Sequence, residues 1–295
     1  MNLFFEQYEQ QAIERIQKFA ALASRMGFRP ALGFSGGKDS QVCYDLCKRA
    51  GIDFDAYFNV SFESNITKKF IREYYPDVIF RKDYKFGFIQ NISVNHSCLL
   101  PTKEIDYCCK DYKHNPRYVD AASIVGVRKA ESAARKTRTV LSVKNKSNLK
   151  KNKQLYGEYF RAGCQSTGTQ SEIQLMPVVD FSDDEIWDYI KKYNLPVNPE
   201  YKMGRKRIGC IVCPKTNFSS NLNGLYRYPK LIDAFIRVRE RGTVDWIIRN
   251  DNKDYSDDKV YYICRWLNRS FRKFSKRQER EYQEFRTFYD NYKRK

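Results

Sequence analysis

The residues with the most distinctive chemistry form one short glycine-rich run, Ser35-Gly36-Gly37-Lys38-Asp39-Ser40. Two adjacent glycines allow a sharp turn that presents successive backbone N–H groups to an anion, and Lys38 can pair with a phosphate oxygen. The hydroxyls of Ser35 and Ser40 can donate further hydrogen bonds. Because the charge of Asp39 repels a phosphate, we interpret Asp39 as a ligand of a Mg²⁺ ion that bridges the phosphates. The spacing excludes a Walker A loop, which requires GxxxxGK followed by Ser or Thr.

The elements on either side of this run are predicted to be a strand and a helix. Residues 29–34 read as a short buried strand, and residues 41–50 have the apolar spacing of a helix, whose N-terminal dipole also favours an anion. Further strands are predicted at 55–60, 77–81, 122–127 and 175–179, and further helices at 4–25, 66–75, 86–95, 103–113 and 183–193, the last capped by Ser182. This alternation predicts an α/β fold with a doubly wound, mostly parallel sheet.

A second segment with phosphate chemistry follows the strand predicted at 122–127. It reads Gly126-Val127-Arg128-Lys129-Ala130-Glu131-Ser132, and Arg135 follows it closely. The guanidinium groups of Arg128 and Arg135 have the planar fork that suits a phosphate.

These two segments resemble the PP-loop and the GxRxxES…R segment of the adenine nucleotide α-hydrolase superfamily, in its phosphoadenylyl-sulfate (PAPS) reductase branch. Residues 177–187, PVVDFSDDEIW, resemble the P…DWT…W stretch of the same branch, and we expect Trp187 to pack its helix onto the sheet. The resemblance extends over residues 29–214. It implies a HUP-like ATP pyrophosphatase domain at 1–215 and cleavage of ATP to AMP and pyrophosphate. Composition alone predicts a basic, aromatic-rich helical region at 216–295.

The resemblance also assigns the site residues. It implies catalytic roles for Lys38, Asp39, Arg128 and Arg135. The residues that it places against ATP and its phosphates are Ser35, Gly36, Gly37, Lys38, Asp39, Ser40, Asn59, Gly126, Arg128, Glu131 and Ser132.

The nine cysteines indicate sulfur or metal chemistry, because an odd number in a chain without a signal-like segment does not suggest a disulfide framework. The pair Cys108-Cys109 and the later Cys210-x-x-Cys213 resemble the [4Fe–4S] ligands of adenylyl-sulfate reductases. A zinc site and unliganded thiols remain alternatives. The ATP pyrophosphatases of DNA phosphorothioation are similar here but have one cysteine at the position of Cys108, so Cys98 or Cys164 could replace Cys109. We expect Cys43, Cys47 and Cys264 to be core residues.

The charge of the chain favours a polyanionic partner. The net charge is +19, and residues 265–295 contain eleven lysines and arginines against four acidic residues, interleaved with aromatic residues. Together with the basic segment 144–153, this region is predicted to bind nucleic acid, although its aromatic residues have a spacing that also fits packing of an amphipathic helix. The residues assigned to nucleic acid are Arg269, Arg272, Lys273, Lys276 and Arg277.

The intact SGGKDS run and the lack of an ECGxH-like stretch after Cys264 disfavour a reductase. We therefore predict an ATP pyrophosphatase that adenylates an acceptor for sulfur incorporation, with DNA backbone phosphorothioation preferred. The alternatives are an adenylyl-sulfate or PAPS reductase of sulfate assimilation and a tRNA thiolation enzyme. The predicted cofactors are ATP, Mg²⁺ and a [4Fe–4S] cluster. The predicted partners are DNA in preference to tRNA and a cysteine desulfurase or other sulfur donor, and a homodimer remains open. No apolar stretch reaches membrane-spanning length, so we expect a cytoplasmic protein without a membrane partner.

Overall fold

The computed structural model describes residues 3–82, 85–114, 119–144, 164–166, 171–242, 258–269 and 271–294, leaving out the side chains of residues 3–5 and 164–166. Most of the basic segment 144–153 and the side chain of Cys164 therefore lie outside the described residues.

The chain forms two compact units. The first comprises Met1–Val60, Asn65–Arg81 and His114–Met203, and the second comprises Ser61–Ser64, Lys82–Lys113 and Gly204–Lys295. The division expected at 215/216 therefore falls at 203/204 instead. The segment 82–113, expected in the first domain, belongs to the second unit because it packs with residues that follow 203.

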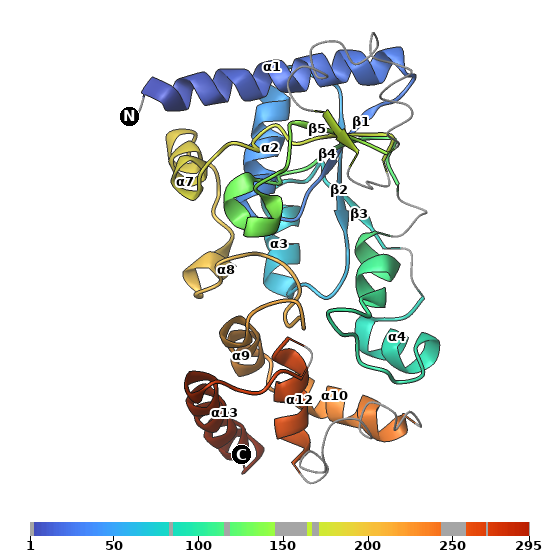
Figure 1. The fold of residues 1–295 in the computed structure, drawn as a ribbon, viewed down its shortest axis with the longest axis vertical. Helices are drawn as coiled ribbons and strands as arrows, with labels where there is room; N and C mark the ends of the chain where they lie inside the picture. Colours follow the sequence, from blue (N-terminus) through green and yellow to red (C-terminus); the bar gives the residue numbers. More distant parts are fainter. Residues whose placement is uncertain are drawn as a thin grey trace. The chain divides into compact units, whose positions relative to one another are not determined.

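The first unit contains a seven-stranded sheet in the order β3-β2-β1-β4-β7-β5-β6. All neighbouring pairs are parallel except β5 with β7. The strands are β1 (Pro30–Gly33), β2 (Asp55–Asn59), β3 (Ile79–Arg81), β4 (Ala122–Ile124), β5 (Leu141–Val143), β6 (Cys164–Ser166) and β7 (Ile173–Leu175). The predicted α/β class and mostly parallel sheet are confirmed, with helices on both sides of the sheet (Figure 1).

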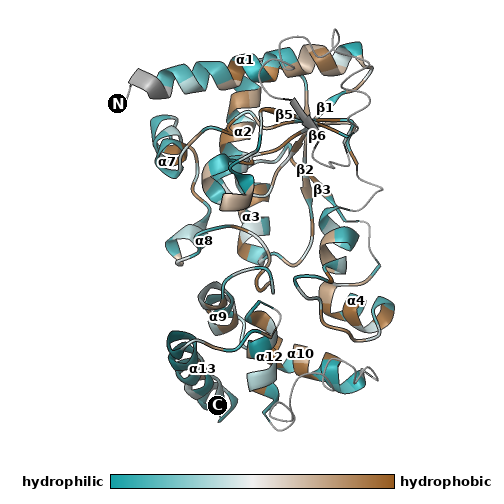
Figure 2. Ribbon diagram, in the orientation of Figure 1, coloured by the Kyte–Doolittle hydropathy of each residue, from teal (hydrophilic) through white to brown (hydrophobic). Residues whose placement is uncertain are grey.

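Four helices of the first unit correspond to predicted helices. They are α1 (Leu3–Arg25), α2 (Lys38–Arg49), α3 (Asn65–Tyr74) and α7 (Asp183–Lys192). The short α8 (Pro199–Lys202) was not predicted. Ser182 caps α7 as predicted, since its hydroxyl accepts the N–H of Glu185 at 3.1 Å while the Glu185 carboxylate accepts the N–H of Ser182. The core lies between the sheet and these helices, and the strands are coloured mainly as hydrophobic residues in Figure 2.

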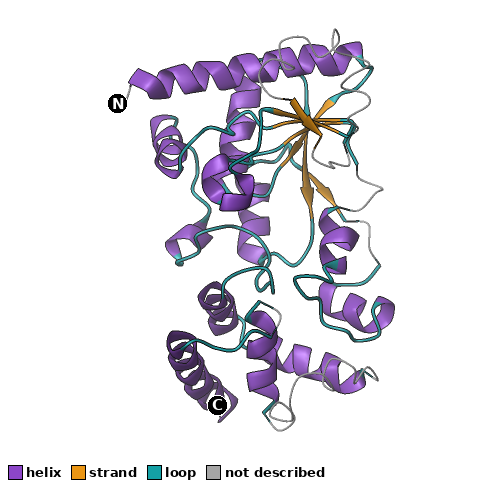
Figure 3. Cartoon of the chain, in the orientation of Figure 1, coloured by secondary structure: helices purple, strands orange, loops and turns teal. Residues whose placement is uncertain are grey.

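The second unit is helical in the residues that the structure describes, as Figure 3 shows. Its helices are α4 (Phe88–Asn95), α9 (Phe218–Arg227), α10 (Lys230–Arg241), α12 (Lys259–Leu267) and α13 (Lys276–Arg294). The helix predicted at 103–113 is shorter than expected and ends in a π-helical turn, Cys109–Lys113. Among the described helices, none is both long enough and apolar enough to cross a membrane.

The aromatic residues of the C-terminal region form part of the core of the second unit. Tyr282, Phe285 and Tyr289 on α13 are at most 4% exposed, and Phe271 and Phe274 pack against the same core. The three rings on α13 pack as in an amphipathic helix, so the expectation that aromatic residues of this region stack on bases is wrong for those three.

Candidate functional site

The glycine-rich run lies between β1 and α2, at the carboxyl end of the parallel strands where α/β proteins bind ligands. Gly36 has φ of +73°, and a Cβ atom there would meet Ile71 at 3.0 Å, so the turn needs glycine. Asn59, also assigned to the nucleotide, ends β2 at the same edge of the sheet. The local sequence therefore places a turn of backbone N–H groups at the start of α2, where an anion is favoured.

The two serines of the run hold the turn together. The Ser40 hydroxyl accepts the N–H of Ser35 at 3.1 Å and donates to the carbonyl of Gly37 at 2.9 Å. The Ser35 hydroxyl accepts the N–H of Gly37 at 3.3 Å and lies 3.1 Å from that of Ser40. The serines therefore fix the shape of the loop.

Two residues near α8 support the loop, and neither was assigned to the site from the sequence. The Asn198 amide, fully buried, donates to the carbonyl of Gly36 at 3.1 Å. The Tyr201 hydroxyl accepts the backbone N–H of Lys38 at 2.9 Å. This N–H group belongs to the turn at the start of α2, and Tyr201 accepts from it in place of an anion. Trp187 packs edge-on against Tyr201 with ring centroids 5.1 Å apart. Trp187 therefore supports the loop through Tyr201.

The charged side chains at the loop form a closed network of two cations and two carboxylates: Lys38, Asp39, Arg128 and Asp183. Lys38 Nζ lies 3.2 Å from Asp39 Oδ1 and 3.0 Å from Asp183 Oδ1. Arg128 Nε donates to Asp39 Oδ1 at 2.5 Å, and its Nη2 donates to Asp183 Oδ1. The structure thus brings Arg128 of the second segment to the loop. Asp183, the first residue of α7, is an additional member that sequence reasoning missed.

Electrostatics keep Arg128 and Asp183 ionised. Burial acts to lower the pKa of Arg128, but the charge of Asp39 and hydrogen bonds to Asp183 and Asp39 raise the pKa above its ordinary value. Burial acts to raise the pKa of Asp183, but hydrogen bonds from Lys38 and Arg128 hold the pKa below its ordinary value. Two full positive charges are therefore positioned where the phosphates of a nucleotide are expected.

The remaining residues of the second segment support Arg128. A Cβ atom on Gly126 would lie 2.9 Å from the backbone carbonyl of Asp39, so only glycine allows the segment to approach the loop this closely. Glu131 accepts the N–H of Arg128 at 3.0 Å and also pairs with Arg135. Arg135 is therefore paired with Glu131, and Ser132 begins the turn that carries Arg135.

The four cysteines assigned to a cluster lie in one neighbourhood of the second unit. A hydrogen bond with Cys109 and burial raise the pKa of Cys108, and the charges of Cys210 and Cys213 raise it further. The hydrogen bond from Cys108 and the positive charges of Lys215 and Lys113 lower the pKa of Cys109. In contrast, Cys43, Cys47 and Cys264 are fully buried in the two hydrophobic cores, as expected.

The backbone around the cysteines is held by buried polar residues. Glu63 forms an isolated backbone bridge with Cys210, and its carboxylate pairs with Lys113 at 3.2 Å. Asn221 binds both backbone polar groups of Cys213. Among the described residues, no group of three or more His, Cys, Asp or Glu side chains is arranged to hold a single metal ion.

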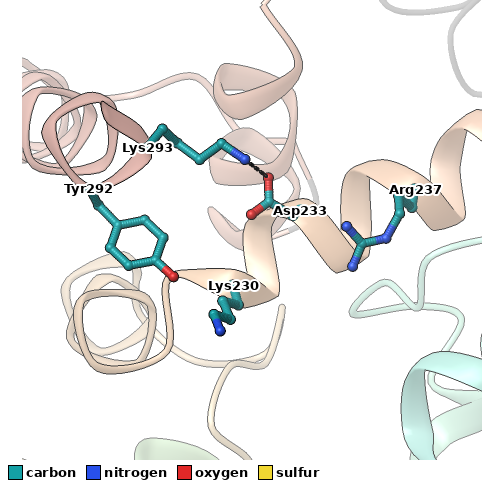
Figure 4. Close-up of a pocket in the computed structure, with 5 residues that line it drawn as sticks. All are labelled: Lys230, Asp233, Arg237, Tyr292 and Lys293. Atoms are coloured by element: carbon teal, nitrogen blue, oxygen red, sulfur yellow. Dashed lines mark hydrogen bonds and ion pairs between the residues drawn. The ribbon is translucent and has the colours of Figure 1, made fainter. Parts of the chain in front are cut away.

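The basic residues assigned to nucleic acid are all exposed, in the turn before α13 and in its first residues. Arg277 is partly neutralised by Glu281 at 2.9 Å. A separate pocket of about 390 Å³ adds to the positive surface of this unit. Figure 4 shows its lining, which consists of Lys230, Asp233 and Arg237 on α10 and Tyr292 and Lys293 on α13. Lys293 pairs with Asp233 at 3.1 Å, so the three cations of the pocket exceed its single carboxylate.

The chain is similar to proteins of one enzyme family. The family model of the phosphoadenosine phosphosulfate reductase domain matches residues 29–216. An uncharacterized protein of Methanocaldococcus jannaschii is 25% identical over 248 residues, covering 80% of this chain and 54% of that protein, so this chain spans about half of its length. An adenosine 5'-phosphosulfate reductase of Staphylococcus haemolyticus is 40% identical over 48 residues, 16% of this chain and 20% of the reductase. The crystal structure of PAPS reductase from Candida auris, in a phosphate complex, has a TM-score of 0.46 and 16% identity, covering 71% of this chain and 96% of that chain.

Proposed function

The chain belongs to the phosphoadenosine phosphosulfate reductase domain family, and from this membership we propose that it is an ATP pyrophosphatase that adenylates an acceptor for sulfur incorporation. The observation that carries the proposal is the loop Ser35–Ser40, with its backbone turn at the start of α2 and with Lys38 and Arg128 on either side of Asp39. A site of this kind has positive charge for the pyrophosphate that leaves ATP and a carboxylate for a divalent cation.

The residues of the charge network have separate roles in this proposal. Lys38 and Arg128 bind phosphate oxygens and stabilise the negative charge that develops on pyrophosphate when the acceptor oxygen attacks the α-phosphorus. Asp39, partly exposed on the loop, would hold Mg²⁺, which supplies neutralising charge on the phosphates when bound. Gly126 and Glu131 keep Arg128 in place.

The structure also gives a reason to prefer this activity over sulfate reduction. A reductase of this family needs a nucleophilic cysteine toward the C-terminal side. Cys264 is fully buried in α12, and burial raises its pKa well above the ordinary value. A buried thiol in apolar surroundings is inert, so Cys264 does not supply that nucleophile.

We propose that Cys108, Cys109, Cys210 and Cys213 hold a [4Fe–4S] cluster. Four thiols in one neighbourhood, with Lys113 and Lys215 close to them, supply the number and the type of sulfur ligands that such a cluster uses. Each thiolate of a cluster binds a different iron, so a cluster does not require three ligands around one ion. When bound, the cluster would supply a stable cross-link between the Cys108-Cys109 turn and the Cys210–Cys213 turn.

We propose that the acceptor is nucleic acid, and DNA in preference to tRNA. The support is the exposed cations before and within the first turn of α13, together with the excess positive charge of the pocket on α10. Sulfur would arrive from a separate donor such as a cysteine desulfurase. Its persulfide would attack the adenylated acceptor and displace AMP, and a thiol would then reduce the resulting disulfide, which leaves the sulfur on the acceptor and frees the donor cysteine.

The phosphate loop is tested with Lys38→Ala and Asp39→Ala in a pyrophosphate-coupled assay. Both variants should lose pyrophosphate release while retaining the circular dichroism of the wild type, because the two side chains act on the ligand. Wild-type turnover in either variant would refute the assignment of the loop.

The acceptor is tested by salt titration of DNA binding with a charge-matched control. Replacing Arg272, Lys273 and Lys276 with Gln should reduce the log–log salt slope on duplex DNA by about 2.7, because each lost phosphate contact accounts for about 0.9. Replacing three exposed cations of the first unit, Arg25, Lys69 and Lys191, should leave the slope unchanged. A flat response of the wild-type protein would remove nucleic acid from the proposal. If the wild-type protein shows the expected salt slope, mass spectrometry of nuclease-digested DNA and tRNA shows which of the two acceptors carries sulfur.

A further inference from the structure

Asp183 belongs to the charge network although it lies outside both phosphate-binding segments. It is the first residue of α7, and the same carboxylate oxygen, Oδ1, accepts from Lys38 Nζ at 3.0 Å and from Arg128 Nη2. Lys38 and Arg128 are the two cations that the proposed function assigns to the phosphates. Asp183 therefore pairs with the same two groups that the phosphates of ATP would need.

The members of the network differ sharply in their access to water. The side chains of Arg128 and Lys38 are 1% and 7% exposed, whereas that of Asp183 is 70% exposed. A buried cation needs a counter-ion, because an unpaired buried charge is strongly destabilising. An exposed carboxylate can separate from its partner into water at little cost. Asp183 is thus the member that can leave, and Arg128 is the member that must always be neutralised.

Asp39 differs from Asp183 in its attachment. It is adjacent to Lys38 in the chain, its side chain is 23% exposed, and its backbone is in close contact with Gly126. Asp39 therefore stays beside the cations whatever occupies the site.

We propose that Asp183 is an exchangeable counter-ion, which neutralises Lys38 and Arg128 in the empty site and is replaced by phosphate oxygens when ATP binds. The inference rests on the proposed function, because it takes ATP as the ligand of the loop. Asp183 competes with the phosphates, so it lowers nucleotide affinity and at the same time stabilises the empty protein. The residue is a positioning residue for the cations and does not react itself.

The test is Asp183→Asn, which removes the charge and keeps an oxygen acceptor of the same shape. Binding of ATP and of inorganic pyrophosphate is measured by calorimetry in EDTA, so that no divalent cation contributes. The variant should bind both ligands about two- to fivefold more tightly, the range expected for a largely exposed ion pair. Its melting temperature without ligand should fall, and the difference from wild type should narrow at saturating pyrophosphate, because binding then stabilises the variant more.

Asp184→Asn is the matched control. Asp184 is exposed in the same first turn of α7. Its substitution therefore changes the net charge and the interaction with the helix dipole by the same amount as Asp183→Asn does. It should bind both ligands with wild-type affinity.

The outcomes distinguish failure of the role assigned to Asp183 from failure of the proposed ATP pyrophosphatase function. If wild type binds ATP and pyrophosphate but Asp183→Asn binds them equally or more weakly, Asp183 is not an exchangeable counter-ion. Weaker binding that appears only when Mg²⁺ is added would make Asp183 a metal ligand and also overturn the inference. Failure of the wild-type protein to bind either ligand would overturn the proposed function, and the inference with it.

Discussion

The side-chain amide of Asn221 hydrogen-bonds both backbone polar groups of Cys213, accepting its N–H at 2.8 Å and donating to its carbonyl at 2.9 Å. The same amide donates to the carbonyl of Leu267 at 2.9 Å, and Asn221 is 1% exposed. One buried side chain on α9 therefore ties the turn of Cys210–Cys213 to the end of α12. The basic turn that we assign to nucleic acid begins directly after α12.

Substitution of Asn221 with Ala should destabilise the second unit. It leaves the N–H and carbonyl of Cys213 and the carbonyl of Leu267 without this partner, and an unsatisfied buried polar group costs about 1–3 kcal/mol. We expect the free energy of unfolding in urea to fall by about 3 kcal/mol in total. Asn223→Ala, on the same helix but more exposed, is the control and should cost much less. Equal effects of the two substitutions would show that the Asn221 hydrogen bonds do not carry this stability.

Substitution of Gly126 with Ala should impair ATP cleavage without unfolding the protein. The new Cβ atom would lie 2.9 Å from the backbone carbonyl of Asp39, and a backbone group cannot move aside as a flexible side chain can. We expect turnover to fall at least about tenfold, a barrier change of about 1.4 kcal/mol, as Asp39 and Lys38 shift. Gly87→Ala is the control, because a Cβ atom at Gly87 would meet nothing within 4 Å. Normal turnover of Gly126→Ala would show that the contact with Asp39 does not position the loop.

Glu9 should make the stability of the first unit depend on pH. Its buried carboxylate pairs with Arg49 at 2.6 Å and with Lys192 at 3.1 Å, linking α1 to α2 and α7. Burial acts to raise the pKa of Glu9, but hydrogen bonds from Tyr193, Arg49 and Lys192 lower it below the ordinary 4.5. Because the folded pKa is lowered, this stabilisation is present above pH 4.5 and is lost as the pH falls through the folded pKa.

The corresponding measurement is urea unfolding of Glu9→Gln at pH 7 and at pH 3. At pH 7 the variant should lose about 1 kcal/mol, since Glu9 pairs with two cations that are exposed to water, and the difference from wild type should narrow at pH 3. Glu14→Gln, exposed on the same helix, should have little effect at either pH. A difference that does not change with pH would contradict the ionised state of Glu9.

Substitution of single cysteines tests the proposed cluster and its ligands. Protein purified without oxygen should contain about four irons per chain, as a [4Fe–4S] cluster requires. Cys210→Ser and Cys213→Ser should lose the iron and the brown colour, and Cys109→Ser should lose them while Cys98→Ser should not. Stoichiometric zinc without iron would refute the cluster. If Cys98→Ser loses the iron and Cys109→Ser retains it, the fourth ligand is Cys98 and not Cys109.

The features that local sequence determines were predicted correctly. The turn at Gly36 and Gly37 and the cap at Ser182 depend on residues a few positions apart, and the structure places both as expected. The contacts of Tyr201 and Asp183 with Lys38 span 163 and 145 positions, so no local pattern indicates them. An acidic residue at the start of a helix, as at position 183, is also explained by the helix dipole alone.

The organisation into units was harder to predict for a related reason. Residues 82–113 follow three strands of the first unit, so chain order assigns them to it, but they pack with residues 204–295. The strands β5 and β6 contain three residues each, too few for an alternating pattern to be recognised. The aromatic spacing of α13 fitted both a core and a base-stacking surface, and the burial of Tyr282, Phe285 and Tyr289 shows that it is core.

The products formed from ATP test the central claim most directly. Purified protein is incubated with ATP and Mg²⁺, and in parallel with adenylyl sulfate and a thiol reductant, and the products are separated by chromatography. We predict AMP and pyrophosphate from ATP, no sulfite from adenylyl sulfate, and loss of the ATP reaction in Lys38→Ala. Formation of ADP and phosphate from ATP, or release of sulfite from adenylyl sulfate, would contradict the assignment of this chain as an ATP pyrophosphatase.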